Sequence, residues 1–216
     1  MCRILLVRNK EMFDPSIYLQ KFSLMARKSK EYQGDGWGYA YWMKNHWVPY
    51  KSVNPIWEES FDNFPLTNLL IAHARSSFNN TGPDIDSTMP FIRSSKAFIF
   101  NGELRKVRLS SKGKTGAEKL FNFIIRLERG DLYDATKKAM NIIQDRTDYI
   151  RAANFIIADN KLALIFSLYN EDRDYFTLWQ FKDENGFIIC SEPLDTNIGW
   201  NSFSNEYFQV INYSSY

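Results

Sequence analysis

The residue with the clearest chemical potential is Cys2, which directly follows Met1. A small second residue allows the initiator methionine to be removed, which leaves Cys2 with a free α-amino group. Such an amine has a pKa of roughly 7.7–8.0, so an appreciable fraction is neutral at cellular pH and can act as a base. It can take the proton of the neighbouring thiol and later return it to a leaving amine. Cys2 could therefore supply nucleophile and base together, although a small second residue also occurs by chance.

A second candidate is the pair Asn101 and Gly102, which follows the apolar run 97–100. We expect this run to form a strand that the pair ends. At such a position a side-chain amide and a nearby backbone N–H can both point at a developing oxyanion. The alternative is a plain hairpin turn, because Asn-Gly is a strong turn signal.

Arg75 is the third candidate, and Ser76 and Ser77 follow it. It comes directly after the apolar run 68–74, which predicts a buried strand, so its side chain can reach into a cleft. A guanidinium group is suited to bidentate capture of a carboxylate. The alternative is an exposed arginine at a strand end. His73, just before it, is interpreted as a core histidine that is not catalytic.

The elements that must position these residues follow from apolar patterning. Asp14-Pro15 predicts a helix start, and Thr115 to Glu118 matches a capping box at the start of another. The predicted helices are 15–28, 55–64, one that follows the Thr115 cap and has Leu120, Phe121, Ile124 and Leu127 on one face, and 132–145. The predicted strands are 2–7, 39–43, 47–51, 68–74, 97–100, 154–158, 162–169, 176–181, 186–190 and 207–212. Strands at both ends with helices between them indicate one α+β domain over residues 1–216, with sheets packed face to face.

Composition excludes several classes of function. The formal net charge is +2, from 27 basic and 25 acidic residues, which gives no electrostatic reason for a nucleic-acid partner. No apolar run is long enough to span a membrane, and no signal peptide is expected. The two cysteines, Cys2 and Cys190, predict a reducing, cytoplasmic setting and no disulfide framework. Cys190 is interpreted as a small buried hydrophobe, and two histidines cannot build a Cys/His zinc cluster.

Six segments, in order along the chain, resemble stand-alone class II glutamine amidotransferase-like proteins. They are Met1-Cys2, Gly34-Asp-Gly-Trp-Gly-Tyr-Ala-Tyr41, Ala72-His-Ala-Arg75, Pro90-Phe91, Phe98-Ile-Phe-Asn-Gly-Glu103 and Ser191-Glu-Pro-Leu194. The resemblance covers residues 1 to about 200. It implies the N-terminal-nucleophile hydrolase fold, a four-layer αββα sandwich of two antiparallel sheets.

The resemblance also implies roles for individual residues. Cys2 is the expected nucleophile, forming a thioester with the γ-acyl group of glutamine or of a γ-glutamyl small molecule. Asn101 and Gly102 are the expected oxyanion hole. Arg75, with Ser76 and Ser77, is expected to bind the substrate's α-carboxylate. No metal and no cofactor is implied, and any ammonia that is transferred is expected to pass to a separate acceptor subunit.

The sequence departs from the family pattern around this site. Phe100 and Met89 stand where the family usually has histidines, and Phe78 stands where a threonine is typical. Gly116 occupies the place of an aspartate that holds the substrate's α-amino group. Two hypotheses therefore remain: an amidohydrolase or amidotransferase with a Cys2 nucleophile, and a catalytically degenerate member that acts as a binding or regulatory subunit.

Overall fold

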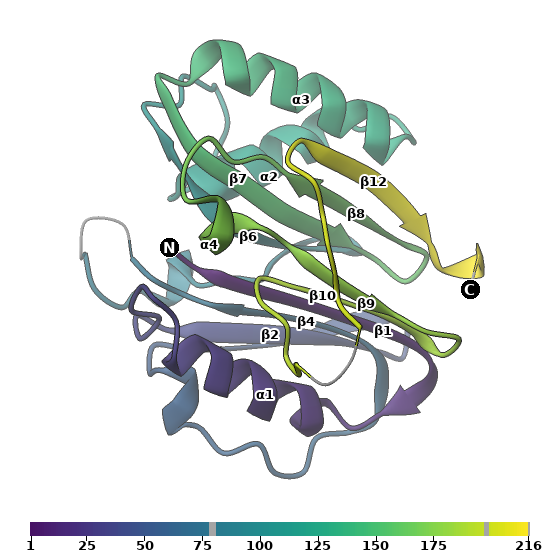
Figure 1. Cartoon of the computed structure of the whole chain (residues 1–216). Coiled ribbons are helices and arrows are strands. Elements are labelled where there is room, and N and C mark those ends of the chain that lie inside the picture. The colour runs from purple at the N-terminus through teal and green to yellow at the C-terminus, as the bar shows by residue number, and fades with distance from the viewer. Residues whose placement is uncertain (78–80, 197–198, 216) are drawn as a thin grey trace.

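The computed structural model describes residues 1–77, 81–196 and 199–215. Two antiparallel sheets form its centre, and each sheet contains strands that are far apart in the sequence (Figure 1). The first sheet has seven strands in the order β11-β9-β10-β1-β4-β2-β3. Its strands are β1 (Arg3–Phe13), β2 (Trp37–Met43), β3 (His46–Ser52), β4 (Thr67–Ala74), β9 (Trp179–Lys182), β10 (Gly186–Cys190) and β11 (Asn201–Ser202).

The second sheet has five strands in the order β12-β8-β7-β6-β5. Its strands are β5 (Phe91–Arg93), β6 (Lys96–Arg105), β7 (Tyr149–Ala158), β8 (Leu162–Ser167) and β12 (Tyr207–Asn212). The α-helices are α1 (Pro15–Arg27), α2 (Gly116–Leu127), α3 (Leu132–Arg146) and α4 (Arg173–Phe176). Single 3-10 turns are η1 (Ile56–Glu58), η3 (Ile85–Ser87) and η4 (Tyr213–Ser215).

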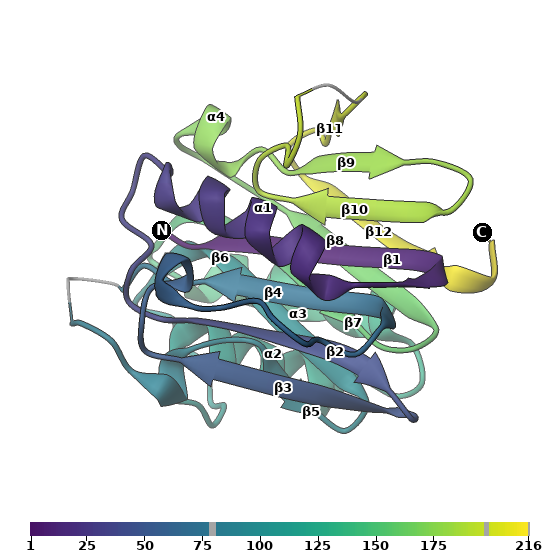
Figure 2. The same ribbon diagram turned by 90° about the horizontal axis from the view of Figure 1, so that it is seen from below.

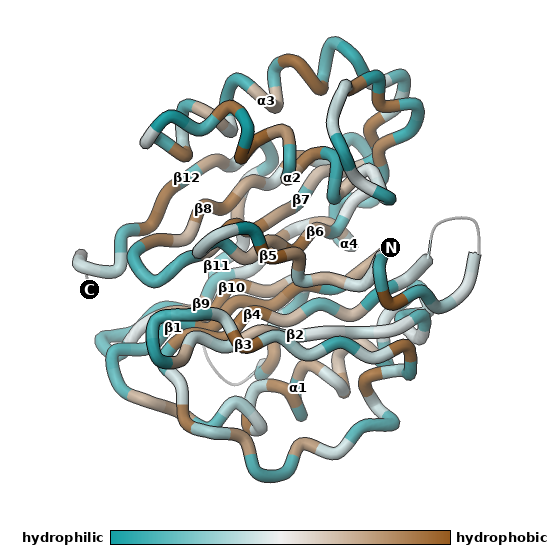
Figure 3. The backbone as a smooth tube through the Cα atoms, turned by 180° about the vertical axis from the view of Figure 1, so that it is seen from behind, coloured by the Kyte–Doolittle hydropathy of each residue, from teal (hydrophilic) through white to brown (hydrophobic). Residues whose placement is uncertain are grey.

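The elements form four layers. Helix α1 lies over β1 and β4 on the outer face of the seven-stranded sheet, as Figure 2 shows, while α2 and α3 cover the outer face of the five-stranded sheet. Strand periodicity explains the packing, because alternate side chains point to opposite faces. In β1, Leu5 and Val7 pack beneath α1, whereas Ile4 and Leu6 join the core between the sheets. Figure 3 shows the apolar segments concentrated in these strands. The predicted αββα architecture is confirmed.

The helix starts are set by side chains that satisfy free backbone amides. The carboxylate of Asp14 accepts from Ser16 N at 2.8 Å, and Pro15 occupies the first helical position of α1. At α2, the hydroxyl of Thr115 accepts from Glu118 N at 3.1 Å, which confirms the predicted cap. The Glu118 carboxylate returns to Lys114 N at 2.8 Å rather than to Thr115 N, so the reciprocal bond of the box is made one residue earlier.

Several predicted elements differ from the observed ones. The predicted strand 2–7 runs on to Phe13, and the predicted strand 154–158 begins at Tyr149. Asn101 and Gly102 do not end a strand, because β6 continues to Arg105 and pairs with β7 throughout. The predicted helix 55–64 is reduced to the single turn η1, because Glu59 directly after it is extended, with φ of −99° and ψ of 150°. The predicted strand 176–181 begins only at Trp179, because the preceding residues form α4.

Candidate active site

Strand parity brings Cys2 and Arg75 to the same face. Side chains two residues apart in a strand point to the same face, so Cys2 lies on the face of Ile4 and Leu6. By the same rule Arg75 lies on the face of Leu69 and Ile71. These four apolar residues face the space between the sheets. In the antiparallel register Arg3 pairs with Ala74, so Cys2, just before Arg3, lies next to Arg75, just after Ala74. The Cys2 thiol donates to the carbonyl of Ser76 at 3.6 Å, which fixes it at the end of β4.

Arg75 is held by the glycine-rich turn before β2. Its backbone N–H donates to Gly36 O at 2.8 Å, and its Nη1 donates to Asp35 O and to Gly82 O, both at 2.8 Å. The side chain is buried. Gly36 has a φ of 111°, and an added Cβ would lie 2.8 Å from the carbonyl of Ser52, so this turn requires glycine.

Ser76 and Ser77 continue this wall. Ser76 contributes its carbonyl to the thiol, while Ser77 donates its backbone N–H to Asp35 Oδ2 at 2.7 Å. The Ser77 hydroxyl accepts from Gly82 N at 3.3 Å. Both serines therefore shape the loop around Arg75. Phe78, which stands where the proteins that the sequence resembles usually have a threonine, lies outside the described residues.

Asn101 and Gly102 approach from the second sheet. Phe98 stacks on Phe121 of α2, so two-residue periodicity turns Asn101 towards the other sheet, where Cys2 lies. The Asn101 side chain is fully buried, and both its amide atoms lack a hydrogen-bond partner among the described residues. Gly102 packs closely against β7, since an added Cβ would lie 2.2 Å from Ala152 O.

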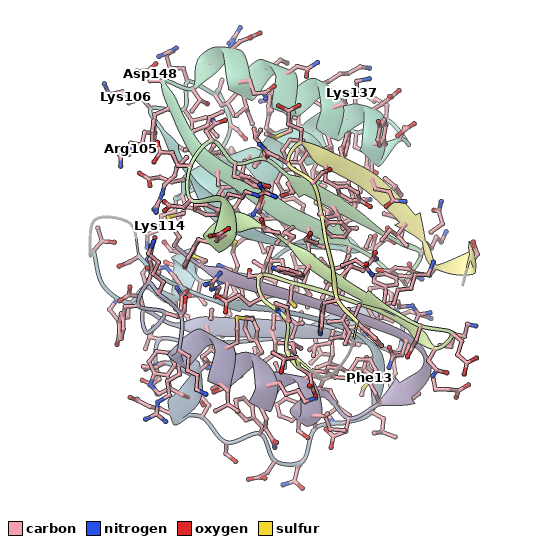
Figure 4. All side chains as sticks on the ribbon, viewed as in Figure 1. Phe13, Arg105, Lys106, Lys114, Lys137 and Asp148 are labelled. Atoms are coloured by element: carbon pink, nitrogen blue, oxygen red, sulfur yellow. The ribbon has the colours of Figure 1, made fainter. Side chains whose placement is uncertain are left out.

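These residues surround one cavity of about 740 Å³, which we call the Cys2 cavity. Its walls include the N-terminus with Cys2, residues 75–77, residues 102–105 and residues 114–117 at the start of α2. Asn101 lies behind this wall and is not part of its surface. Lys114 and Arg105 mark the cavity on the edge of the molecule where the N-terminus lies (Figures 1 and 4). Cys2, Arg75 and Gly102 are therefore brought together around one space.

Gly116 also lines the cavity, at the first position of α2. The nearest atom to an added Cβ there is Leu104 O at 4.0 Å, so a larger side chain fits without displacement. No acid stands at this position, but the helix N-terminus itself favours negative charge nearby. Phe100, which stands where the proteins that the sequence resembles usually have a histidine, forms part of the cavity wall and is otherwise buried.

Cys2 is a protonated thiol in this state of the chain. Burial raises its pKa, and the positive charges of the Met1 ammonium and of Arg75 oppose that rise without cancelling it. Because Met1 is attached, the nitrogen of Cys2 is an amide and cannot serve as a base. While Met1 is attached, the thiol of Cys2 therefore has no α-amine of its own residue beside it.

Sequence reasoning missed a charged network beside the thiol. One carboxylate oxygen of Glu31 forms an ion pair with the Met1 ammonium, and the other lies 3.0 Å from Arg151. Arg151 also forms an ion pair with Asp172, at 2.5 Å. Arg151 also lies 3.8 Å from Glu103. Residues 31, 103, 151 and 172 share no motif, so only the fold could bring them together.

His73 and Cys190 lie in the core and do not line the Cys2 cavity. His73 is fully buried, and desolvation, aided by Arg75, lowers its pKa to about 3, so the ring is neutral at physiological pH. Cys190 is also fully buried; its thiol donates to Glu192 O at 2.6 Å, and burial raises its pKa. The interpretation of both as core residues agrees with this placement.

Two broader features complete the description of the site. Among the described residues, no group of three or more His, Cys, Asp or Glu side chains is arranged to hold a metal ion. In the same part of the chain, no helix combines the length and the apolar character needed to cross a membrane.

Comparison with known proteins identifies the fold. No family model and no curated protein matches the sequence. Among solved structures, a class II glutamine aminotransferase domain protein of Silicibacter pomeroyi is 14% identical, with a TM-score of 0.68 over 99% of this chain and 96% of that one. A predicted glutamine amidotransferase of Pseudomonas aeruginosa is 17% identical, with a TM-score of 0.60 over 97% of this chain and 96% of that one.

A longer structure has the same fold. The glutamine phosphoribosylpyrophosphate amidotransferase of B. subtilis, complexed with ADP and GMP, is 16% identical with a TM-score of 0.71. The match covers 99% of this chain and 48% of that enzyme, so this chain corresponds to about half of it. The chain therefore has the N-terminal-nucleophile hydrolase fold found in class II glutamine amidotransferase domains.

Proposed function

We propose that this protein cleaves the γ-amide of glutamine or of a γ-glutamyl compound, with Cys2 as the nucleophile after Met1 has been removed. The observation that carries the proposal is the placement of Cys2 beside Arg75 on one cavity wall, with the buried, unpaired amide of Asn101 behind the opposite wall. A thiol, a carboxylate-binding cation and an oxyanion donor are the groups that this reaction requires.

In the proposed mechanism, the free α-amine of Cys2 takes the thiol proton as sulfur attacks the γ-carbonyl carbon. The carbonyl π electrons move to oxygen, and the oxyanion receives hydrogen bonds from the Gly102 N–H and from the Asn101 amide, whose side chain must turn from behind the wall to reach it. The intermediate then expels ammonia, or an amine, which carries away the proton. Water hydrolyses the thioester, and glutamate and the thiol are released. Arg75 binds the α-carboxylate through guanidinium nitrogens other than Nη1, which the backbone already occupies.

The released ammonia has two possible fates in this proposal. It leaves into solvent, which makes the protein a glutaminase, or it passes to a separate acceptor subunit.

The second candidate function is a non-catalytic binding or regulatory subunit. The observation that favours it is that the ammonium and the carbonyl of Met1 both have hydrogen-bond partners elsewhere in the fold.

Covalent labelling tests the enzyme proposal. A glutamine-like diazoketone should alkylate Cys2 in a chain that begins at Cys2, because this thiol lines the cavity and has a base beside it. Cys190 is the internal control, since it is fully buried and donates to Glu192 O. Peptide mapping by mass spectrometry measures both sites. Label on Cys190 alone, or on neither cysteine at saturating reagent, would support the non-catalytic function instead.

The Gly116→Asp substitution is expected to raise kcat/KM for glutamine hydrolysis roughly ten- to a hundredfold, because a carboxylate there can hold the substrate's α-ammonium group. The open space around Gly116 and its place in the first turn of α2 allow the substitution. Gly116→Asn is the matched control, since it has nearly the same shape without the charge. Glutamate release is measured for all three proteins. Equal rates for the Asp and Asn variants would show that another residue holds the amine.

A further inference from the structure

Met1 is bound by the rest of the chain as a ligand would be. Its ammonium pairs with Glu31, and its carbonyl oxygen accepts from Gln33 Nε2 and from Tyr175 Oη, both at 2.5 Å. Its side chain packs against a small apolar cluster, and only 12% of it is exposed. We call this set of contacts the Met1 site: Glu31, Gln33 and Tyr175, with the apolar residues Ala152, Tyr169 and Phe176.

The charge at the Met1 site suits a primary ammonium group. Partial burial disfavours the ionised form of Glu31, but hydrogen bonds from the Met1 ammonium and from Arg151 outweigh this and lower its pKa. Arg151 holds one carboxylate oxygen at 3.0 Å, which leaves the other for the ammonium. Arg151 is itself fixed by Asp172, so the carboxylate is oriented by groups other than Met1.

The two donors to the carbonyl are also positioned independently of Met1. Gln33 Nε2 additionally donates to Glu31 O at 2.8 Å and to Tyr175 Oη at 3.1 Å. The guanidinium of Arg3 lies 3.9 Å from the centre of the Tyr175 ring and donates to Tyr175 O at 3.1 Å. Burial raises the pKa of Tyr175 to about 12, so its hydroxyl stays a donor at physiological pH. The site is therefore pre-organised and should keep its shape when Met1 leaves.

We infer that, once Met1 has been removed, the Met1 site binds a free ligand with the same three features. The ligand class is an apolar α-amino acid, its amide, or the amino-terminal residue of a peptide. It presents a primary ammonium to Glu31, a carbonyl oxygen to Gln33 and Tyr175, and a compact apolar side chain to Ala152 and Phe176. The inference rests on the proposed removal of Met1, and it adds a second binding site directly beside the Cys2 amine.

Calorimetric titration with L-methioninamide tests this inference without any turnover. The protein is prepared with Cys2 as its first residue, by cleavage from a fusion, and a parallel sample retains Met1. Saturable one-to-one binding is expected for the first protein and no binding for the second, because Met1 fills the site there. N-acetyl-L-methioninamide, which has no ammonium, should bind at least roughly tenfold more weakly.

Variants of the protein that begins at Cys2 locate the binding. Glu31→Gln should weaken L-methioninamide binding roughly ten- to a hundredfold, since a charge-assisted hydrogen bond is lost. Tyr175→Phe keeps the ring and its packing, and should weaken binding a few-fold. Glu128→Gln is the matched control, because Glu128 is also a part-buried acid in an ion pair, with Lys96 at 3.0 Å, at the other end of α2. Circular dichroism verifies the fold of each variant.

Three results would overturn the inference: equal binding when Met1 is retained, binding that Glu31→Gln and N-acetylation leave unchanged, or no binding to a folded protein that begins at Cys2. A chain that begins with Cys2→Ala separates this inference from the proposed function. It has no nucleophile, yet it should bind L-methioninamide normally. Normal L-methioninamide binding to the protein that begins at Cys2, together with no glutamate release from that same protein, would contradict the enzyme proposal and leave the Met1 site established.

Discussion

A protein that keeps Met1 is expected to release no measurable glutamate from glutamine, whereas the same chain beginning at Cys2 is expected to be active. The nitrogen of Cys2 is an amide while Met1 is attached, so the proposed base does not exist. Burial also raises the pKa of the thiol, so the nucleophilic thiolate is scarce. Met1 in addition lines the cavity that the substrate must enter.

The comparison needs two preparations whose intact masses differ by one methionine residue. Glutamate release is followed for both at the same protein concentration, with Cys2→Ala as the blank. A chain that begins with Cys2→Ser is an informative third sample, because it restores the amine but supplies a weaker nucleophile. Full activity in the protein whose mass includes Met1 would exclude the α-amine of Cys2 as the base.

Arg75→Lys is expected to lower kcat/KM for glutamine roughly 10²- to 10³-fold, equivalent to about 3–4 kcal/mol of lost transition-state binding. Lysine keeps the charge but not the planar group that can bind two backbone carbonyls and a carboxylate at once. Nη1 of Arg75 already donates to Asp35 O and Gly82 O, so the remaining guanidinium nitrogens are the ones available for substrate. Arg75→Ala should abolish turnover, but it also leaves those two carbonyls without their donor.

A control arginine separates substrate binding from general electrostatics. Arg93 pairs with Glu118 at 2.6 Å on the surface beside α2, and Arg93→Lys should leave both kcat and KM unchanged. A glutamine analogue without the α-carboxylate provides the second control, since its already low kcat/KM should not fall further in Arg75→Lys. If the analogue and glutamine lose the same factor, Arg75 shapes the loop and does not bind the carboxylate.

Much of the architecture could be predicted because the apolar patterning is strong. The runs 2–7, 68–74 and 186–190, which became parts of β1, β4 and β10, are mostly apolar, and the cap at Thr115 located the start of α2 correctly. That Cys2 and Arg75 share a face depends on the pairing of β1 with β4, which the sequence did not predict. Local rules sufficed wherever an element's own residues determine both its type and its buried side.

Asn101 shows where local rules fail. The polar residues after Phe100 indicated the end of a strand, but β7 offers backbone partners as far as Tyr149, so β6 continues to Arg105. Asn101 is buried without a hydrogen-bond partner among the described residues, whereas Glu103 pairs with Arg105 and lies 3.8 Å from Arg151. Glu31, Gln33 and Tyr175 escaped notice for the same reason, because their common role depends on a meeting of residues that are more than 140 positions apart.

The position of β1 has a consequence for how the protein matures. The first strand to be synthesised lies between β4 and β10, and its partner in β10 ends at Cys190. At roughly 5–20 residues per second, the ribosome needs about 10–40 s to reach that residue. During this interval the amino terminus cannot be locked into the finished sheet and is open to an aminopeptidase. If the proposed removal of Met1 occurs, it is therefore expected to be easiest before β10 pairs with β1.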